Sequence, residues 1–300
     1  MDPGASATTL QTYASLPNVD GVAFRVLWSN LEPTAGSYNW AALDSAFAVV
    51  RRSNKKLTLH VDPNALGLPG WLGPLGVATY TYTDPHGSQT APVPWDAVYV
   101  SRYRAFVTAL GAHVQATGNV DLLESLSDPV PAPEMTIVGC QNGQLTGGIT
   151  YNRSQYLAAW DTTISAYASA FPGIRLFVSA PLGFICLGDG NDGQTFYADV
   201  MRYALSLTSN AAVFAADLTA LGSQRLQQAG SLPGQTAIGL QTIWSYTNDP
   251  TNRMQGTLTD AVCRGWNAGA RYFEIYQPDL ISADAGVQTA IASARTGQTC

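Results

Sequence analysis

The sequence predicts an α/β protein that folds as a single (β/α)8 TIM barrel over residues 1–300. Strand-like and helix-like segments alternate along the chain, which is typical of parallel strands joined by crossover helices. No glycine-rich phosphate-binding loop follows the first strand, so a nucleotide-binding doubly wound sheet lacks its main support. No charge run, low-complexity segment or linker marks a domain boundary, and one barrel often uses about 250 residues or more.

The predicted strands are short runs of apolar and β-branched residues bounded by turns. We expect them at residues 21–28, 57–61, 120–126, 175–180, 212–218, 236–243 and 272–277. Helical periodicity predicts helices near residues 40–52, 97–117, 154–170, 195–207, 258–268 and 287–294, with a short helix near residue 224. An eighth strand would precede Gly21, but residues 1–20 indicate mainly a helix. We therefore expect a very short first strand or a barrel that is incomplete on its N-terminal side.

Two connections are longer than compact domains usually need. Residues 62–94 are rich in proline and glycine and carry several aromatic side chains, and residues 127–150 follow the third predicted strand. Both connections start at the C-terminal end of a strand, where barrel enzymes place their active sites. We expect them to contribute to a binding cleft.

The charge of the chain argues against a nucleic-acid partner. The formal net charge is −6, and Lys55 and Lys56 are the only lysines. Phosphate binding needs clustered lysine and arginine. No apolar stretch reaches the roughly 18 residues that cross a bilayer, so we also expect no membrane partner.

The four cysteines are Cys140, Cys186, Cys263 and Cys300, and their spacing contains no CxxC motif that would favour a zinc or thioredoxin-like site. An even number indicates two disulfides, for which three pairings exist. We favour Cys140 with Cys186 and Cys263 with Cys300. Because disulfides persist in oxidising compartments, we expect a secreted protein, with four free thiols in a cytosolic protein as the alternative.

A pattern of spaced residues spans the end of the first predicted strand and the turn after it. Its members are Arg25, Trp28, Leu31, Glu32, Pro33, Gly36, Tyr38, Trp40, Leu43 and Asp44. The pattern resembles that of clan A retaining glycoside hydrolases, such as cellulases and β-galactosidases. This resemblance implies a barrel that cleaves O-glycosidic bonds of an extracellular poly- or oligosaccharide with two glutamates, and the rest of the chain shares only the strand–helix rhythm.

Retaining hydrolysis needs two carboxyl groups about 5 Å apart, one as nucleophile and one as general acid and then base. Glu134 follows a proline-stiffened segment after the third predicted strand, and we predict it to be the acid/base residue. Glu274 lies in an apolar strand, where a carboxylate is costly unless it is paired or lines a polar cavity. We predict Glu274 to be the nucleophile, with an internal ion pair to Arg25 or Arg271 as the alternative.

The other two glutamates have weaker claims. Glu32 lies in a turn and is expected to bind backbone or an arginine, whereas Glu124 lies within a strand and is a secondary candidate or the partner of an arginine. An esterase lacks support because the sequence has no G-x-S-x-G elbow.

The sequence departs from the resembling family in one respect. Those enzymes carry the acid/base residue in an Asn-Glu pair after one strand and the nucleophile three strands later. Here the corresponding strand ends with the sequence LSDP, which contains Asp128, and the strand three further on offers Gln241. Three hypotheses follow: a rearranged pair, a miscounted strand at residues 212–218 with Asp217 as a substitute carboxylate, or a barrel that binds sugar without cleaving it.

Sugars are bound by aromatic faces and by polar side chains that read hydroxyl groups. We predict that the substrate-binding residues lie at strand ends or in the long connections: Arg25, Trp28, His60, Trp71, Asp128, Gln241, Trp244 and Tyr276. Arg25 is expected to hold the nucleophile ionised, and His60 to orient a carboxylate or a hydroxyl. We expect a monomer with a carbohydrate substrate, no catalytic metal and no cofactor, since the three histidines are not clustered.

Overall fold

Seven parallel strands form one sheet in the computed structural model, which describes residues 6–63, 67–84, 87–127, 131, 140, 142–180, 186, 191–229, 237–298 and 300. In spatial order they are β1 (Gly21–Leu27), β2 (Lys56–Asp62), β5 (Leu123–Ser127), β8 (Arg175–Ser179), β9 (Ala211–Leu218), β10 (Ile238–Thr242) and β11 (Tyr272–Glu274). Each overlaps a predicted strand. The predicted α/β barrel class is therefore confirmed.

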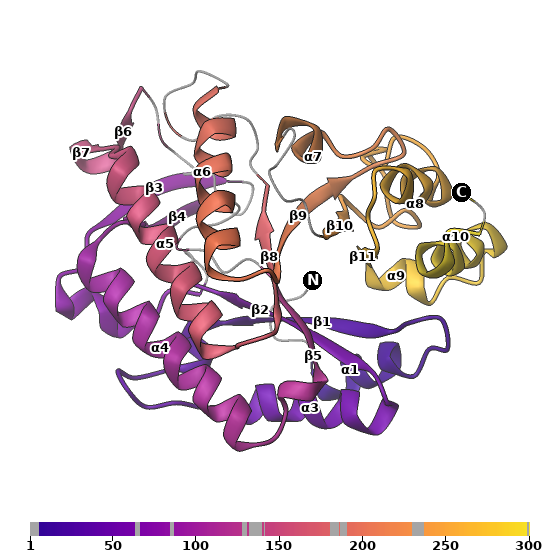
Figure 1. The fold of residues 1–300 in the computed structure, drawn as a ribbon, viewed down its shortest axis with the longest axis horizontal. Coiled ribbons are helices and arrows are strands. Elements are labelled where there is room, and N and C mark those ends of the chain that lie inside the picture. Colours follow the sequence, from indigo (N-terminus) through magenta and orange to yellow (C-terminus); the bar gives the residue numbers. More distant parts are fainter. Residues whose placement is uncertain are drawn as a thin grey trace.

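The helices follow one another around the outside of the curled sheet (Figure 1). The longer ones are α3 (Ala41–Ser53), α4 (Ala97–Ala116), α5 (Arg153–Ala170), α6 (Asn191–Leu207), α8 (Leu258–Asn267) and α10 (Ala285–Thr296). The shorter ones are α1 (Ala7–Ala14), α2 (Trp28–Leu31), α7 (Gln224–Ala229) and α9 (Gln277–Leu280). Across the described part of the chain, no helix has the length and apolar character that a membrane span requires.

The residues of β1 alternate between two environments. Those that face the helices are buried in one cluster with side chains of α3 and α4; they are Val22, Phe24 and Val26. Because successive side chains of a strand point to opposite faces, Arg25 faces the interior of the curled sheet. In β2 the same alternation turns Thr58 and His60 inward. The interior of this barrel therefore carries polar groups.

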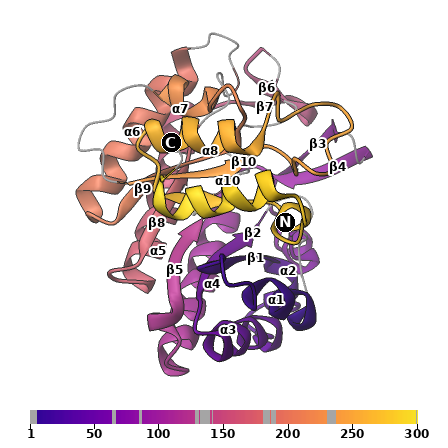
Figure 2. The same cartoon turned by 90° about the vertical axis from the view of Figure 1, so that its right-hand side faces the viewer.

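The edge strands of the sheet, β1 and β11, are not paired with each other in the described residues, and we call the boundary between them the seam. The helix α1 precedes β1 where an eighth strand was considered. Polar side chains join this seam. Arg295 of α10 donates to both carboxylate oxygens of Asp20 at 2.8 and 2.7 Å, and Asn18 donates to Gln288 at 2.7 Å. Figure 2 shows α10 on the same side of the molecule as α1 and β1. The expectation of an N-terminally incomplete barrel fits the described residues.

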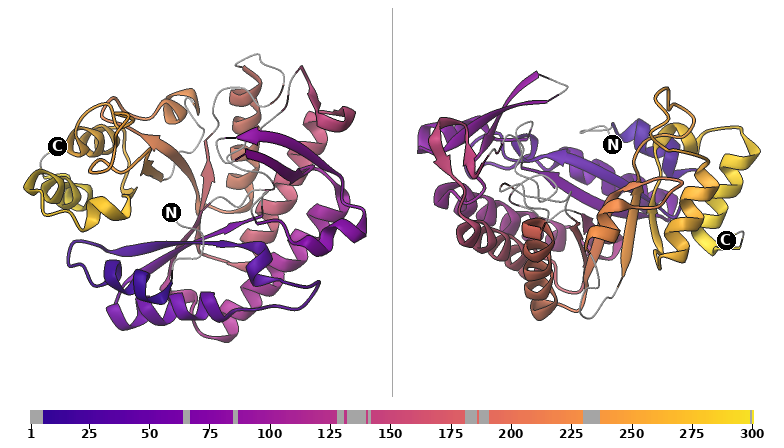
Figure 3. Two further views of the ribbon diagram at one scale, coloured as in Figure 1. Left: turned by 180° about the vertical axis from the view of Figure 1, so that it is seen from behind. Right: turned by 90° about the horizontal axis from the view of Figure 1, so that it is seen from above.

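Each long connection contains a small antiparallel hairpin, which we did not predict. The first has strands β3 (Thr79–Asp84) and β4 (Gly87–Pro92), and the second has β6 (Gln144–Leu145) and β7 (Ile149–Thr150). The backbone N–H of Thr81 donates to Thr146 Oγ1 at 2.7 Å, so the first hairpin contacts the 3-10 turn between β6 and β7. Both views in Figure 3 show these hairpins on the side of α4 and α5.

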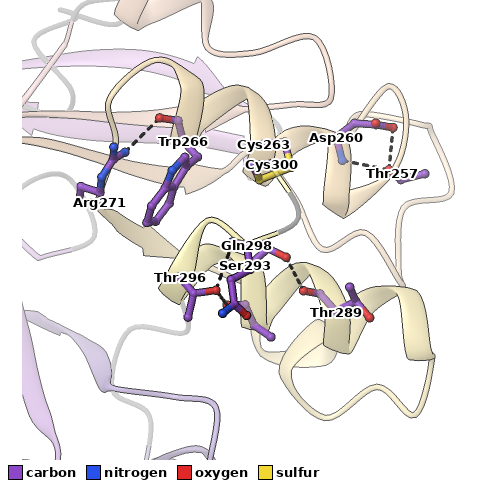
Figure 4. The surroundings of a disulfide bond; sticks show 11 residues. Thr257, Asp260, Cys263, Trp266, Arg271, Thr289, Ser293, Thr296, Gln298 and Cys300 are labelled. Atoms are coloured by element: carbon purple, nitrogen blue, oxygen red, sulfur yellow. Dashed lines mark hydrogen bonds between the residues drawn. A yellow bond between two sulfur atoms is a disulfide. The ribbon is translucent and has the colours of Figure 1, made fainter.

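The four cysteines form the two predicted disulfides. Cys140 is bonded to Cys186 with their Cα atoms 5.2 Å apart, and Cys263 to Cys300 with their Cα atoms 4.9 Å apart. Figure 4 shows the second bond between α8 and the segment after α10. The first ties the connection after β5 to the connection after β8.

We predict that replacing Asp161 of α5 makes the protein more stable at pH 7. Burial, and secondarily the charge of Asp199, raises the pKa of Asp161 from 3.8 to about 6. The native state thus binds more protons than the unfolded state between these values, so this group lowers stability as the pH rises from about 4 to about 6. Thermal unfolding of Asp161→Asn should match wild type below pH 4 and show a higher midpoint at pH 7. An equal difference at both pH values would contradict this.

Candidate active site

A row of polar side chains lies at the C-terminal ends of the first three strands of the sheet. Arg25, His60 and Ser127 are partners in the parallel register of β1, β2 and β5. One level lower, the hydroxyl oxygens of Thr58 and Ser125 lie 2.8 Å apart. Active sites of barrel enzymes are built at this end of the strands.

A second group comes from the other edge of the sheet, where Gln241 of β10 is the register partner of Glu274 of β11. The ring of Tyr272 lies 4.7 Å from the ring of Phe177, and a Cβ atom on Gly239 would lie 2.7 Å from a Phe177 ring carbon. Tyr272 and Gly239 therefore face the interior. Gln241 and Glu274, two positions later, face it too.

The side chain of Glu274 is buried, with 8% of its residue surface exposed, and Tyr272 donates to its Oε1 at 2.8 Å. The two arginines proposed as ion-pair partners are engaged elsewhere. Arg25 pairs with Asp62, and Arg271 donates to the carbonyls of Trp266 and Ala270. The predicted support of Glu274 by Arg25 is therefore corrected, since that guanidinium neutralises Asp62.

Asp62 is a site residue that we did not predict. It ends β2 two positions after His60, on the same face, and its carboxylate is almost fully buried against Arg25. The Nε atom of Arg25 is buried without a hydrogen-bond partner in the described residues. Asp62 directly follows a predicted strand, two positions after His60, and this spacing could have indicated from the sequence that Asp62 lies on the same face as His60.

Trp28 does not face the site, which corrects its prediction as a sugar-stacking residue. It is completely buried, its ring centroid lies 5.1 Å from that of Tyr103, and its Nε1 donates to Glu32 Oε2 at 2.7 Å. The backbone N–H of Gly36 donates to the other oxygen of Glu32 at 2.7 Å. Glu32 is thus a turn ligand, as expected. Trp71, half-buried beside Trp28, donates to the Glu32 carbonyl at 2.8 Å.

An aromatic platform, formed by Trp244 and Tyr276, follows β10 and β11. The two ring centroids lie 5.8 Å apart, and Trp244 is 36% exposed. The guanidinium of Arg253 lies 4.4 Å from the Trp244 ring centroid, and Trp244 Nε1 donates to the carbonyl of Asn248 at 2.8 Å. The platform starts directly after the strands that carry Gln241 and Glu274.

A buried carboxylate holds the loop that carries Trp244. Asp279 in α9 is fully buried and accepts hydrogen bonds from two backbone N–H groups, of Tyr246 at 2.9 Å and Thr247 at 2.8 Å. It also accepts from the hydroxyls of Ser245 at 3.0 Å and Thr247 at 2.7 Å. Asp279 therefore fixes the conformation of residues 245–247.

The two alternative candidates for a catalytic carboxylate, Glu124 and Asp217, have structural partners. Glu124 pairs with Arg175 at 2.9 Å, beside a register shift between β2 and β5. Asp217 accepts from the Ser223 hydroxyl and, at 2.8 Å, from the backbone N–H of Arg225, so it caps the start of α7. The hypothesis that Asp217 replaces a catalytic glutamate loses support.

Glu134 and Asp128 lie outside the described residues. Pro131 and Cys140 precede and follow Glu134 in the sequence: the carbonyl of Pro131 accepts from Tyr99 at 3.1 Å, and Cys140 is bonded to Cys186. Their predicted roles remain predictions. Among the described residues, no cluster of three or more histidine, cysteine, aspartate or glutamate side chains is suited to hold a metal ion.

Comparison with known proteins shows the fold. No protein-family model matches the sequence, and no curated protein matches it. The structure is similar to the catalytic domain of the β-amylase from Paenibacillus polymyxa, with a TM-score of 0.67, 10% identity, and coverage of 100% of this chain and 96% of that one. It is also similar to the exo-β-1,4-mannosidase Op5Man5 from Opitutaceae bacterium strain TAV5, with a TM-score of 0.54, 12% identity, and coverage of 97% and 56%. The chain thus has the barrel fold of these glycoside hydrolases.

Proposed function

We propose that the protein is a glycoside hydrolase that cleaves O-glycosidic bonds of an extracellular poly- or oligosaccharide. One observation carries this proposal: a buried glutamate, Glu274, faces the barrel interior at the C-terminal end of β11 and receives a hydrogen bond from Tyr272. A carboxylate in that position suits attack on, or stabilisation of, an oxocarbenium-like centre. The barrel fold shared with the two hydrolases above supports the same reaction class.

In the proposed mechanism Glu274 is the nucleophile and Glu134 the acid/base residue. Glu274 attacks the anomeric carbon as Glu134 protonates the departing glycosidic oxygen, which leaves a covalent glycosyl–enzyme ester. Glu134 then deprotonates a water molecule that attacks the same carbon, and Glu274 leaves as a carboxylate. Two inversions retain the anomeric configuration.

The substrate is proposed to lie along the C-terminal ends of the strands. The platform of the exposed Trp244 and the half-buried Tyr276 offers aromatic faces for sugar rings, and Gln241 lies beside Glu274 to bind hydroxyl groups. Arg25 and His60, at the C-terminal ends of β1 and β2, would bind hydroxyl groups from the other edge of the sheet. We also propose contacts from Trp71 and Asp128 in the long connections.

Export from the cell is part of the proposal. Both disulfides join segments that are far apart in the sequence, by 46 and 37 residues. Such bonds form and persist mainly in oxidising compartments. An extracellular glycan would be accessible to the enzyme there.

The test is a panel of polysaccharides and aryl glycosides, with reducing-sugar release as the readout and ¹H NMR of the first product to read the anomeric configuration. We expect hydrolysis of at least one substrate with retention. Inversion of the anomeric configuration would contradict the role of Glu274 as nucleophile and would indicate that it acts as a general base. Binding of glycans without any product would contradict hydrolysis and favour a non-catalytic carbohydrate-binding barrel, for which the platform is also suited.

A further inference from the structure

Four side chains from three strands form a continuous hydrogen-bonded series in the barrel interior. Tyr272 Oη lies 2.8 Å from Glu274 Oε1 and 2.8 Å from Thr58 Oγ1. Thr58 Oγ1 in turn lies 2.8 Å from Ser125 Oγ. Thr58 and Tyr272 are separated by 214 residues in sequence and belong to β2 and β11, the second and last strands of the sheet. This hydrogen-bonded series therefore connects β5 and β2, near one edge of the sheet, with the carboxylate on β11 at the other edge.

When Glu274 is ionised, the hydrogen bonds of this series have one consistent donor-to-acceptor direction. Each hydroxyl has one proton to donate, whereas an ionised carboxylate only accepts. Tyr272 then donates to Glu274, Thr58 to the phenol oxygen, and Ser125 to Thr58. Hydrogen bonds in such a series polarise one another, so all three hydroxyls stabilise negative charge on Glu274.

Tyr272 is suited to remain the donor. Burial, followed by the charge of Glu274, raises the pKa of the phenol well above 10. Its ring packs against Phe177, with the centroids 4.7 Å apart, and Gly239 leaves room for Phe177 where a Cβ atom would collide with it. The phenol group is thus both protonated and held in place.

The other ionisable side chains of the barrel strands are Arg25, Lys56, His60, Asp62, Glu124, Arg175 and Asp217. Four of them form the pairs Arg25–Asp62 and Arg175–Glu124, Lys56 donates to a backbone carbonyl, and Asp217 caps α7. Because neighbouring ionisable groups influence one another, the Glu274 carboxyl has to be observed directly, so that its own titration is measured.

We infer that Tyr272 is a positioning residue for Glu274: as the last member of the series Ser125–Thr58–Tyr272, its phenol keeps the carboxylate ionised and fixes its orientation. The effect of Tyr272 on catalysis rests on the proposed function, in which Glu274 must be ionised to attack. The effect of Tyr272 on the protonation of Glu274 is independent of the proposed function.

The experiment compares wild type with Tyr272→Phe, Thr58→Val and the control Tyr203→Phe. The control variant also removes one phenol hydroxyl, that of Tyr203, whose oxygen lies 2.7 Å from Ser165 Oγ between α5 and α6. The side-chain carboxyl of Glu274 is titrated by ¹³C NMR, with its signal identified by its absence in Glu274→Gln. We expect the midpoint to rise by about one unit or more in Tyr272→Phe, because a hydrogen bond to the charged form is lost. The rise should be smaller in Thr58→Val and absent in the control.

Activity gives a second readout. With a cleavable substrate, Tyr272→Phe should lower kcat about 10- to 100-fold with KM within about twofold, and move the acidic limb of the pH profile to higher pH. A merely structural role would leave the limb in place.

The outcomes separate the two proposals. An unchanged midpoint in both Tyr272→Phe and Thr58→Val overturns the role of Tyr272, whatever happens to activity. If Tyr272→Phe does not fold, Thr58→Val decides, because it keeps the ring and breaks the series one step earlier. A raised midpoint in a protein that cleaves no glycoside supports the role of Tyr272 and contradicts the proposed function.

Discussion

Glu274→Gln is expected to lower kcat/KM for the best glycoside substrate by about 10³-fold or more, because the amide can neither attack the anomeric carbon nor carry its developing charge. The change keeps the size of the side chain and an oxygen that accepts from Tyr272, whose hydroxyl lies 2.8 Å from Oε1. It also removes a charge from a buried position, so the variant should fold. Steady-state kinetics, with thermal unfolding to confirm folding, measure the effect.

Glu124→Gln is the matched control. It makes the same chemical change on another barrel strand, where the carboxylate pairs with Arg175. That pair is more than one-third exposed on both sides, so its loss should change little in stability or rate. If Glu124→Gln removed activity and Glu274→Gln retained it, Glu124 would be the catalytic carboxylate and Glu274 would not.

Asp279→Asn is expected to lower the free energy of unfolding by about 3 kcal/mol. The Asp279 carboxylate is fully buried and receives four hydrogen bonds, three at Oδ1 and one at Oδ2. An amide supplies one acceptor oxygen, so its NH₂ group would face a donor, either the Tyr246 N–H or the groups at Oδ1. Urea unfolding followed by circular dichroism measures the loss, and Trp244 fluorescence reports the adjacent loop.

The control for that variant is Asp284→Asn. Asp284 is the exposed N-cap of α10, where it accepts from the backbone N–H of Val287 at 2.9 Å. Asparagine caps helices about as well as aspartate, so this change should cost a few tenths of a kcal/mol at most. Equal losses in both variants would show that the Asp279 network adds no specific stability.

The strand pattern could be predicted from sequence because local composition determines it. Buried parallel strands are compact apolar runs between turns, and all seven were found, although residues 120–122 form a 3-10 turn before β5. The hairpin of β3 and β4 was overlooked despite its alternation of threonine and tyrosine, because the prolines and glycines around it indicated an irregular loop.

The candidate site was less accessible to prediction because it depends on pairs of residues far apart in sequence. Trp28 follows β1 in the first turn of α2, and burial against Tyr103 of α4 decides its role. Arg25 pairs with Asp62 rather than with Glu274, a choice made by the register of β1 and β2. Tyr272 contacts Thr58 only because the sheet curls. The assignment of Glu274 as nucleophile remains a prediction.

The seam between β1 and β11 has a consequence for how the chain folds. Its contacts join residues separated by 270 and 275 positions, Asn18 with Gln288 and Asp20 with Arg295. Contacts of such long range require closure of nearly the whole chain, and topologies rich in them fold slowly. During synthesis, the segment before β1 therefore leaves the ribosome long before its partners on α10 exist, and these contacts form only after α10 has been made.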